Sequence, residues 1–280
     1  MSPRKEIRVR RWKGGQIAEV DDSVSVEEPL EIRMAFYSGS SKERHQVSVT
    51  MRTPGNDEEL ALGFLYTENL IPSFDKVESL QRIDPGFRKS QRDNIIQVNM
   101  KPGFKPDMDL LSRHFYTTSS CGVCGKTSID LVQSLVETRI DPPELRSSTA
   151  IIASLPEKLE AAQKEFASTG AIHAAALFDQ NGEFMALRED VGRHNALDKL
   201  IGFCLKQQQT PLDQHLLLLS GRASFELLQK ASMAGVQLVA AVGAPSSLAI
   251  QLAEEAGITL IGFVRQERMN IYTHPERIQE

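Results

Sequence analysis

The feature that most constrains the fold is a regular alternation of apolar runs and amphipathic segments over residues 215–264. Three apolar runs predict buried strands, at residues 215–219, 237–242 and 259–264. Two amphipathic segments between them predict helices, at residues 225–234 and 247–256, with Ser224 and Ser246 as caps. This order of elements favours a parallel sheet with right-handed crossovers and helices on both faces. The chain is therefore predicted to be an α/β protein.

The residues before this unit extend it. Ser154, Pro156 and Glu157 form a typical helix start, and Gly170 is placed to end that helix. The other elements predicted here are strands at 173–178 and 183–187, a hairpin turn at Asn181-Gly182 and a helix at 193–208. We expect residues 129–280 to form one layered α/β/α domain, with mainly parallel strands at its end.

A smaller mixed α/β domain is predicted over residues 24–112. Asn56 and Glu59 are spaced as a capping box and predict a helix start. Strands are predicted at 46–52, 76–83 and 94–100, with a turn at Asp84-Pro85-Gly86. The basic, polar residues 1–23 are predicted to be a loose leader, and residues 113–128 a mobile loop.

Composition narrows the functional classes. The 280 residues contain 32 Lys and Arg against 37 Asp and Glu, a formal net charge of -5, so no overall positive field favours nucleic acid. No apolar run is long enough to span a bilayer, and none follows the basic N-terminus as in a secretory signal. Three cysteines are too few for a disulfide framework. We therefore expect a cytoplasmic protein that binds neither nucleic acid nor membrane.

The sharpest local motif is TTSSCGVCGK at Thr117–Lys126. Cys121 and Cys124 form a CxxC pair among glycines and small hydroxyl residues, which favours an exposed loop. Lys126 and nearby backbone N–H groups would lower the pKa of a thiol there, and the thiolate is the nucleophilic form. Three interpretations stay open: a zinc site, a thioredoxin-like dithiol, and a loop that carries sulfur as a persulfide. The first lacks a second CxxC, and the second lacks a neighbouring Trp.

A second candidate site follows from strand order. Ligands of parallel α/β sheets bind beyond the carboxyl ends of the strands, and three loops should meet at that edge. These loops are Ser220–Ser224, Gly243–Ser247 and Arg265–Arg268. Two of them lead into helix N-termini, which attract phosphate, and Arg222, Arg265 and Arg268 offer guanidinium groups to an anion such as a nucleotide. The alternative is that the small residues only build tight turns and the arginines are solvated.

A third cluster, Glu189–Asn195, places acid, base and histidine just before a predicted helix, where either a site or simple capping would use them. His173 lies in an apolar run and is predicted to be a core histidine. Cys204 falls on the apolar face of a helix and is predicted to be inert. A zinc deaminase needs H-x-E with a CxxC downstream. His173-Ala174-Ala175 lacks the glutamate and the CxxC lies upstream, so deaminase activity is not expected.

Together, segments spread over residues 24–278 resemble the FdhD/NarQ family of formate dehydrogenase accessory sulfurtransferases. The matching segments are Glu27–Leu30, Val47–Leu65, Ser119–Lys126, Thr169–Phe178, Glu189–Gly202, Ser220–Ala231, Ala244–Leu248 and Asn270–Ile278. Ala171, Gly243 and Gln266-Glu267 depart from the family's pattern.

The resemblance implies a protein that accepts persulfide sulfur from a cysteine desulfurase. It passes this sulfur to the molybdenum or tungsten bis-pterin guanine dinucleotide cofactor (bis-molybdopterin guanine dinucleotide), which is then inserted into formate dehydrogenase. Cys121 would carry the persulfide and Cys124 would be the second loop cysteine. A homodimer and a cytidine-deaminase-like C-terminal domain are also implied, and no permanently bound metal is expected. The implied cofactor-binding stretch is Phe263, Val264, Arg265, Gln266, Glu267 and Arg268, to which strand order adds Ser220, Gly221, Arg222, Ala244, Pro245 and Ser246.

Two other functional classes stay open. A non-catalytic cofactor-binding chaperone would need the arginine-rich edge but neither loop cysteine. A zinc-stabilised nucleotide-binding module would contain stoichiometric zinc.

Overall fold

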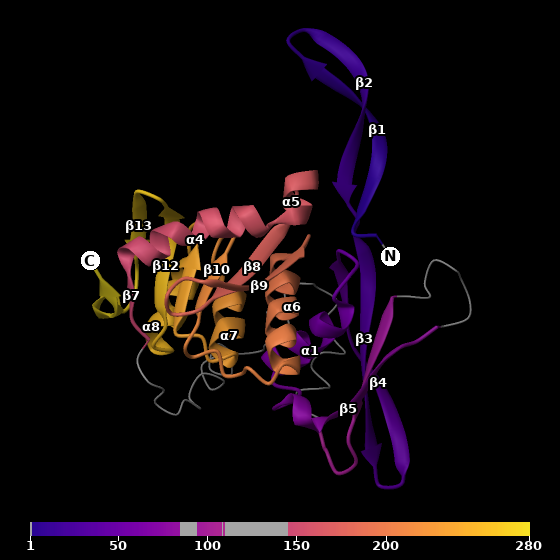
Figure 1. Ribbon diagram of the computed structural model, residues 1–280. Helices are drawn as coiled ribbons and strands as arrows, with labels where there is room; N and C mark the ends of the chain where they lie inside the picture. The colour runs from indigo at the N-terminus through magenta and orange to yellow at the C-terminus, as the bar shows by residue number, and fades with distance from the viewer. Residues whose placement is uncertain (1, 85–93, 108, 110–144) are drawn as a thin grey trace.

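The structure is a computed structural model that describes residues 2–84, 94–107, 109 and 145–280 (Figure 1). The expected CxxC loop with Cys121 and Cys124 lies outside the described residues, as does most of the expected turn at Asp84-Pro85-Gly86. The described chain contains two larger sheets, each with its own hydrophobic core.

The C-terminal sheet has six strands in the order β13-β12-β11-β10-β8-β9. Their bounds are β8 His173–Phe178, β9 Phe184–Asp190, β10 Leu216–Leu219, β11 Leu238–Ala241, β12 Thr259–Arg265 and β13 Arg268–Ile271. The central strands β10, β11 and β12 are parallel, as the alternation predicts. β8, β9 and β13 are antiparallel to their neighbours, so the sheet as a whole is mixed.

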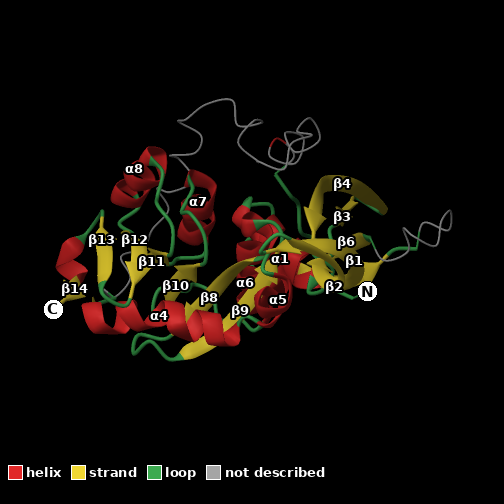
Figure 2. Cartoon of the chain, turned by 90° about the horizontal axis from the view of Figure 1, so that it is seen from above, coloured by secondary structure: helices red, strands yellow, loops and turns green. Residues whose placement is uncertain are grey.

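Helices cover both faces of this sheet, and Figure 2 shows the resulting layers. Their bounds are α4 Thr149–Ala162, α5 Lys164–Thr169, α6 Arg193–Lys206, α7 Phe225–Met233 and α8 Ser247–Glu255. Alternate residues of each strand point to opposite faces. Thus Leu217 packs in the core beneath α6, α7 and α8, whereas Leu216 and Leu218 pack against α4. The α/β/α layering is confirmed, and the likeness to the cytidine deaminase fold stays a prediction.

The expected start of the helix at Ser154 is wrong. α4 begins at Thr149, because the Ser148 Oγ accepts a hydrogen bond from the Ile151 N–H at 3.2 Å. The Ser154 hydroxyl donates instead to the Ile151 carbonyl oxygen, and Pro156 lies inside the helix. The expected single helix is also interrupted, because α4 ends at Ala162 and Gln163 separates it from α5. Gly170, whose φ of 66° suits glycine, ends the second helix, α5.

The N-terminal sheet has four strands in the order β4-β3-β6-β5, with α1 packed against it. The bounds are β3 Glu28–Ser38, β4 Ser41–Arg52, α1 Asp57–Thr67, the 3-10 turn η1 Phe74–Lys76, β5 Val77–Arg82 and β6 Ile95–Met100. The expected capping box does not form. Asn56 has a left-handed backbone and no side-chain cap, and Glu59 pairs with Arg188, with Oε2 2.6 Å from Nε. The ion pair with β9 takes the carboxylate that the capping box would use.

Helices α1 and α6 join the two sheets. A Cβ atom placed on Gly63 would lie 1.8 Å from the Asp198 carbonyl oxygen, and one on Gly202 would lie 1.8 Å from the Glu59 carbonyl oxygen. The backbones therefore touch, which only glycine permits at such a distance. Leu205 of α6 also packs in the core of the N-terminal sheet.

The expectation of a loose leader is wrong for residues 4–23. Strands β1 (Arg4–Lys13) and β2 (Gln16–Ser25) form an antiparallel hairpin that projects from the body (Figure 1). Cross-strand ion pairs, such as Arg8 Nε to Glu19 Oε2 at 3.2 Å, offset the positive charge of β1. At the other end of the chain, the 3-10 turn η4 (Pro275–Arg277) leads into β14 (Ile278–Gln279), which pairs with β7 (Ser147–Ser148). No helix among the described residues is long and apolar enough to cross a membrane.

Candidate ligand-binding site

The loops after β10 and β11 are hydrogen-bonded to each other at the carboxyl edge of the sheet. The Gly243 N–H donates to the Gly221 carbonyl oxygen at 2.9 Å, and the Ala223 N–H donates to the Ala244 carbonyl oxygen at 3.1 Å. A Cβ atom on Gly243 would lie 2.9 Å from the Arg222 backbone nitrogen. The close approach of the two loops explains the small residues and makes this edge rigid.

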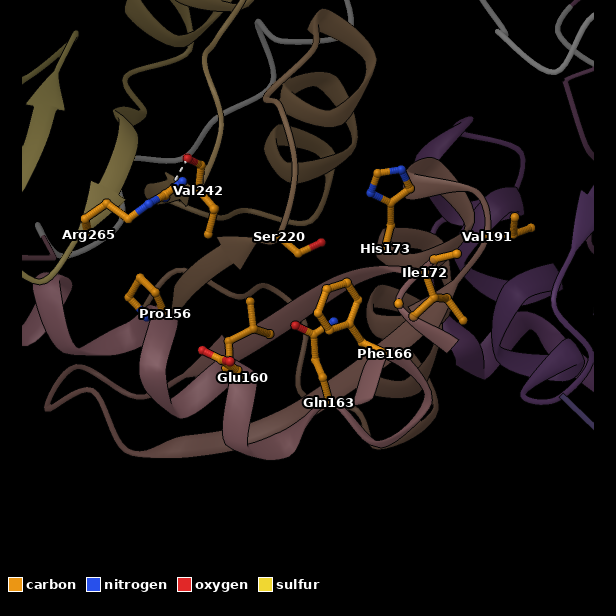
Figure 3. Close-up of a pocket in the computed structure, with 13 residues that line it drawn as sticks. Pro156, Glu160, Gln163, Phe166, Ile172, His173, Val191, Ser220, Val242 and Arg265 are labelled. Carbon is orange, nitrogen blue, oxygen red and sulfur yellow. Dashed lines mark hydrogen bonds between the residues drawn. The ribbon is translucent and has the colours of Figure 1, made fainter. Parts of the chain in front are cut away.

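A cavity of about 660 Å³ lies between this edge and the α4–α5 segment (Figure 3). This volume is in the range of small-molecule sites. Its walls come from three places. The helical wall is Pro156, Leu159, Glu160, Gln163 and Phe166, the strand edge is Ser220, Val242 and Arg265, and the end is Gly170, Ala171, Ile172, His173 and Val191.

Two of the residues predicted to bind a ligand line this cavity. The Arg265 guanidinium is held at the edge, because its Nη1 donates to the carbonyl oxygens of Val242 at 2.9 Å and Val264 at 2.7 Å (Figure 3). The Ser220 Oγ accepts a hydrogen bond from the Ala174 N–H at 2.8 Å, which leaves its own proton to donate. Both side chains are thus positioned before any ligand arrives.

The other predicted binding residues do not line the cavity. Val264 is fully buried in the core, and the Ser246 Oγ caps α8 by accepting from the Ala249 N–H. Gln266 donates to Glu157 at 3.2 Å, from the turn between β12 and β13. The remaining predicted residues occupy the surrounding loops and the β12–β13 hairpin: Gly221, Arg222, Ala244, Pro245, Phe263, Glu267 and Arg268.

His173, predicted to be a core histidine, lines the cavity and is half-buried. Its Nδ1 lies 3.3 Å from the position of a Cβ atom on Gly221, so a larger residue there would crowd the imidazole. Burial lowers the pKa of His173, and the positive charges of Arg193 and His194 lower it further. A neutral imidazole at this end of the cavity can either donate or accept a hydrogen bond.

Glu160, Gln163 and Phe166 also line the cavity and are not predicted from the sequence. Gln163 is only 7% exposed, and its amide nitrogen has no hydrogen-bond partner among the residues the structure describes. A buried donor without a partner costs about 1–3 kcal/mol. No sequence pattern marks Gln163, because the break between α4 and α5 that places it outside both helices is seen only in the structure.

The buried residues of the Glu189–Asn195 cluster, Asp190 and Asn195, have a structural role. The Asp190 Oδ2 lies 2.6 Å from Lys199 Nζ and accepts from the Thr53 N–H at 3.1 Å. Asn195 Nδ2 donates to the Met51 carbonyl oxygen at 2.7 Å. These bonds join the end of β9 and the start of α6 to the N-terminal sheet, so they fix the relative position of the two sheets.

Glu189 and His194 lie beside the cavity region without lining it. The Glu189 carboxylate accepts from the backbone N–H groups of Glu165 and Phe166, both at 3.1 Å, and so caps α5. His194 Nε2 lies 3.4 Å from the Ser224 Oγ and 3.8 Å from Glu226 Oε2. The interaction with His194 lowers the pKa of Glu226 to about 2.

The described residues contain one cysteine, Cys204, which lies on the buried face of α6. Burial raises the pKa of its thiol to about 12, so it stays protonated at neutral pH. Across the described ranges, no three His, Cys, Asp or Glu residues are grouped so as to hold a metal ion.

Comparison with known proteins shows to which family the chain belongs. The model of the FdhD/NarQ family matches residues 26–279. A protein named sulfur carrier protein FdhD from Mycolicibacterium paratuberculosis is 48% identical over 275 residues, 97% of each chain. Its namesake from Streptomyces avermitilis is 46% identical over 278 residues, 98% of this chain and 94% of the relative. A crystal structure assigned to a formate dehydrogenase accessory protein from Desulfotalea psychrophila has a TM-score of 0.74 at 22% identity, over 99% of this chain and 100% of that one. The chain therefore belongs to the FdhD/NarQ family.

Proposed function

We propose that this protein is a sulfur carrier for formate dehydrogenase. It takes persulfide sulfur from a cysteine desulfurase and transfers it to the molybdenum or tungsten bis-pterin guanine dinucleotide cofactor. The observation that carries the proposal is close similarity, over nearly the whole length, to relatives named as sulfur carriers. Cofactor and desulfurase are substrate and donor here, and the chain acts as a homodimer.

The chemistry requires an accessible thiolate. The sequence holds three cysteines, and Cys204 is buried with a raised pKa. Sulfur transfer by this chain therefore falls to Cys121 or Cys124, and the resemblance assigns the persulfide to Cys121. The Cys121 thiolate attacks the outer sulfur of the desulfurase persulfide, and the desulfurase leaves as a thiolate. The Cys124 thiolate then attacks the inner sulfur on Cys121, which forms a disulfide and releases the outer sulfur as hydrosulfide to the cofactor.

The cavity supports the nucleotide part of the proposal. A volume of about 660 Å³ accommodates one nucleotide unit of a larger cofactor, which would extend through the open side. Arg265 at the edge supplies a fixed positive charge for a phosphate, since two backbone carbonyl groups already orient it. Ser220 and His173 add neutral hydrogen-bonding groups within the same cavity.

The test of sulfur transfer is intact mass after incubation with cysteine and an active cysteine desulfurase. The wild-type chain should gain one or more sulfur atoms, and a thiol reductant should remove them. Cys121→Ser should show no gain, whereas the matched control Cys204→Ala should gain sulfur like the wild type, because the Cys204 thiol is buried.

Two results would contradict the proposal. Cys121→Ser that still sulfurates the cofactor and restores formate dehydrogenase would remove the role of Cys121. No gain in the wild type, with a second acceptor showing the desulfurase to be active, would favour a cofactor-binding chaperone or a zinc module instead.

A further inference from the structure

Gln163 stands at the junction of α4 and α5, and its side-chain nitrogen makes no hydrogen bond to the residues that the structure describes. It is the residue after the last turn of α4 and the N-cap residue of α5, yet its side chain caps neither helix. The Glu189 carboxylate caps α5 instead, through the N–H groups of Glu165 and Phe166. Since no hydrogen bond to the described part of the chain uses this buried N–H group, it is available to a ligand.

The Gln163 amide lies inside the cavity, between Glu160 and Phe166 and directed toward the side where Ser220 lies (Figure 3). The residue is 7% exposed, and no described residue accepts a hydrogen bond from its amide nitrogen. Desolvating this donor without a partner is unfavourable, so a ligand that offers an acceptor gains from pairing with it. The ligand atom that meets it is therefore expected to be an oxygen or an unprotonated ring nitrogen.

The two neighbouring side chains define the rest of the ligand. Glu160 lines the same wall one turn earlier and presents a carboxylate, which accepts hydrogen bonds only. Phe166 is 42% exposed and lines the wall three residues later, so its ring can stack on a flat ligand. A flat ring with adjacent N–H donors and one carbonyl acceptor on the same edge matches this set.

Guanine and pterin share such an edge, with an amino group, a ring N–H and a carbonyl oxygen side by side. We propose that Glu160 and Gln163 recognise this amino-oxo-pyrimidine edge while Phe166 stacks on the ring. The carboxylate accepts from the amino group and the ring N–H, and the Gln163 amide donates to the carbonyl oxygen. The inference rests on the proposed function and names the residues that give the cavity its specificity.

The test is calorimetric titration of the full chain with GDP, with IDP, which lacks the amino group, and with free pterin. The wild type should bind GDP roughly tenfold or more tightly than IDP, because a hydrogen bond to the Glu160 carboxylate is lost. Glu160→Gln should reduce that preference. Gln163→Met should weaken GDP binding by about tenfold while the midpoint of thermal unfolding stays the same or rises, because the amide nitrogen makes no hydrogen bond to the residues that the structure describes. A purely structural Gln163 would lower the midpoint instead.

Gln209→Met is the matched control, since Gln209 is exposed after the C-terminal end of α6 and does not line the cavity. It should bind GDP like the wild type.

Tight binding of pterin with weak binding of GDP would support recognition of the amino-oxo-pyrimidine edge and identify the ligand group as the pterin. Equal GDP affinity in the wild type and Gln163→Met would overturn this inference and leave the proposed function standing. A wild type that binds neither GDP nor pterin would overturn the nucleotide part of the proposed function and this inference with it.

Discussion

Gly63 of α1 and Gly202 of α6 are in backbone contact where the two sheets of the protein are joined. A Cβ atom on Gly63 would lie 2.9 Å from the Gly202 backbone nitrogen, and one on Gly202 would lie 2.8 Å from the Gly63 backbone nitrogen. Neither clash can be relieved by a side-chain rotation, because backbone atoms form both sides of it. The relative position of the sheets therefore depends on two glycines that are about half the chain apart in the sequence.

Gly202→Ala should destabilise the fold by about 3 kcal/mol or more, since the helices must separate to admit the methyl group. The measurement is the free energy of unfolding in urea. The control is Gly39→Ala, which has a φ of 62° but nothing within 4 Å of its Cβ position. It should cost only about 1 kcal/mol, from backbone strain alone. Equal losses in the two variants would contradict the close contact.

Lys199→Met should cost about 3–5 kcal/mol of unfolding free energy, because it leaves the buried Asp190 carboxylate without its cation. The Lys199 and Asp190 side chains are 2% and 0% exposed, with Nζ 2.6 Å from Oδ2. Asp190→Asn combined with Lys199→Met should cost less than the sum of the single changes, since the double variant holds no unpaired charge. Additive losses in urea unfolding would show that the two groups act independently.

The Glu226 carboxyl should contribute to acid sensitivity. Its pKa falls from 4.5 to about 2 in the folded protein, so its stabilising contribution is complete above about pH 4.5 and is lost as the pH falls toward 2. Glu226→Gln should therefore lose less unfolding free energy between pH 5 and pH 3 than the wild type does, because it lacks this carboxyl group. The measurement is urea unfolding at each pH.

His194→Gln is the companion variant, because the interaction with His194 is the largest cause of the lowered Glu226 pKa. It should likewise reduce the loss of unfolding free energy between pH 5 and pH 3. A wild-type profile that neither substitution alters would mean that Glu226 titrates alike in the folded and unfolded chains.

Trp12, the only tryptophan of the chain, reports on the N-terminal hairpin. It is 70% exposed, opposite Ile17 near the tip of the β1–β2 hairpin. Its fluorescence should resemble that of tryptophan in water and should be quenched freely by acrylamide in the native protein. An emission shifted to shorter wavelength and protected from quenching would place Trp12 against an apolar surface.

Local patterns were enough for the elements between residues 215 and 264. Each strand there is a short apolar run, and each helix has its apolar face and cap within one segment, so no distant residue is needed to recognise it. The same order of elements placed Ser220 and Arg265 at one edge, because parallel strands end on the same side of a sheet. Family membership also followed from motifs spread along the chain.

Local patterns failed where a distant partner decides the outcome. The 1–23 segment resembles a loose leader because it is highly charged, and only the pairing of Arg8 and Glu19 across the hairpin shows why it forms strands. Glu59 resembles a capping residue until Arg188, 129 positions away in the sequence, takes its carboxylate.

The sequence by itself determined the parallel core, the carboxyl edge and the family, because these depend on periodicity and on short motifs. The tertiary structure decided which side chains line the cavity. Gln163 and Phe166 reach it because Ser148 sets the start of α4 and because Glu189, which lies on β9, caps α5. His173 reaches it because β8 runs antiparallel to β10, which brings its first residue beside the end of the neighbouring strand. Both placements depend on contacts between segments far apart in the chain, which no local pattern records.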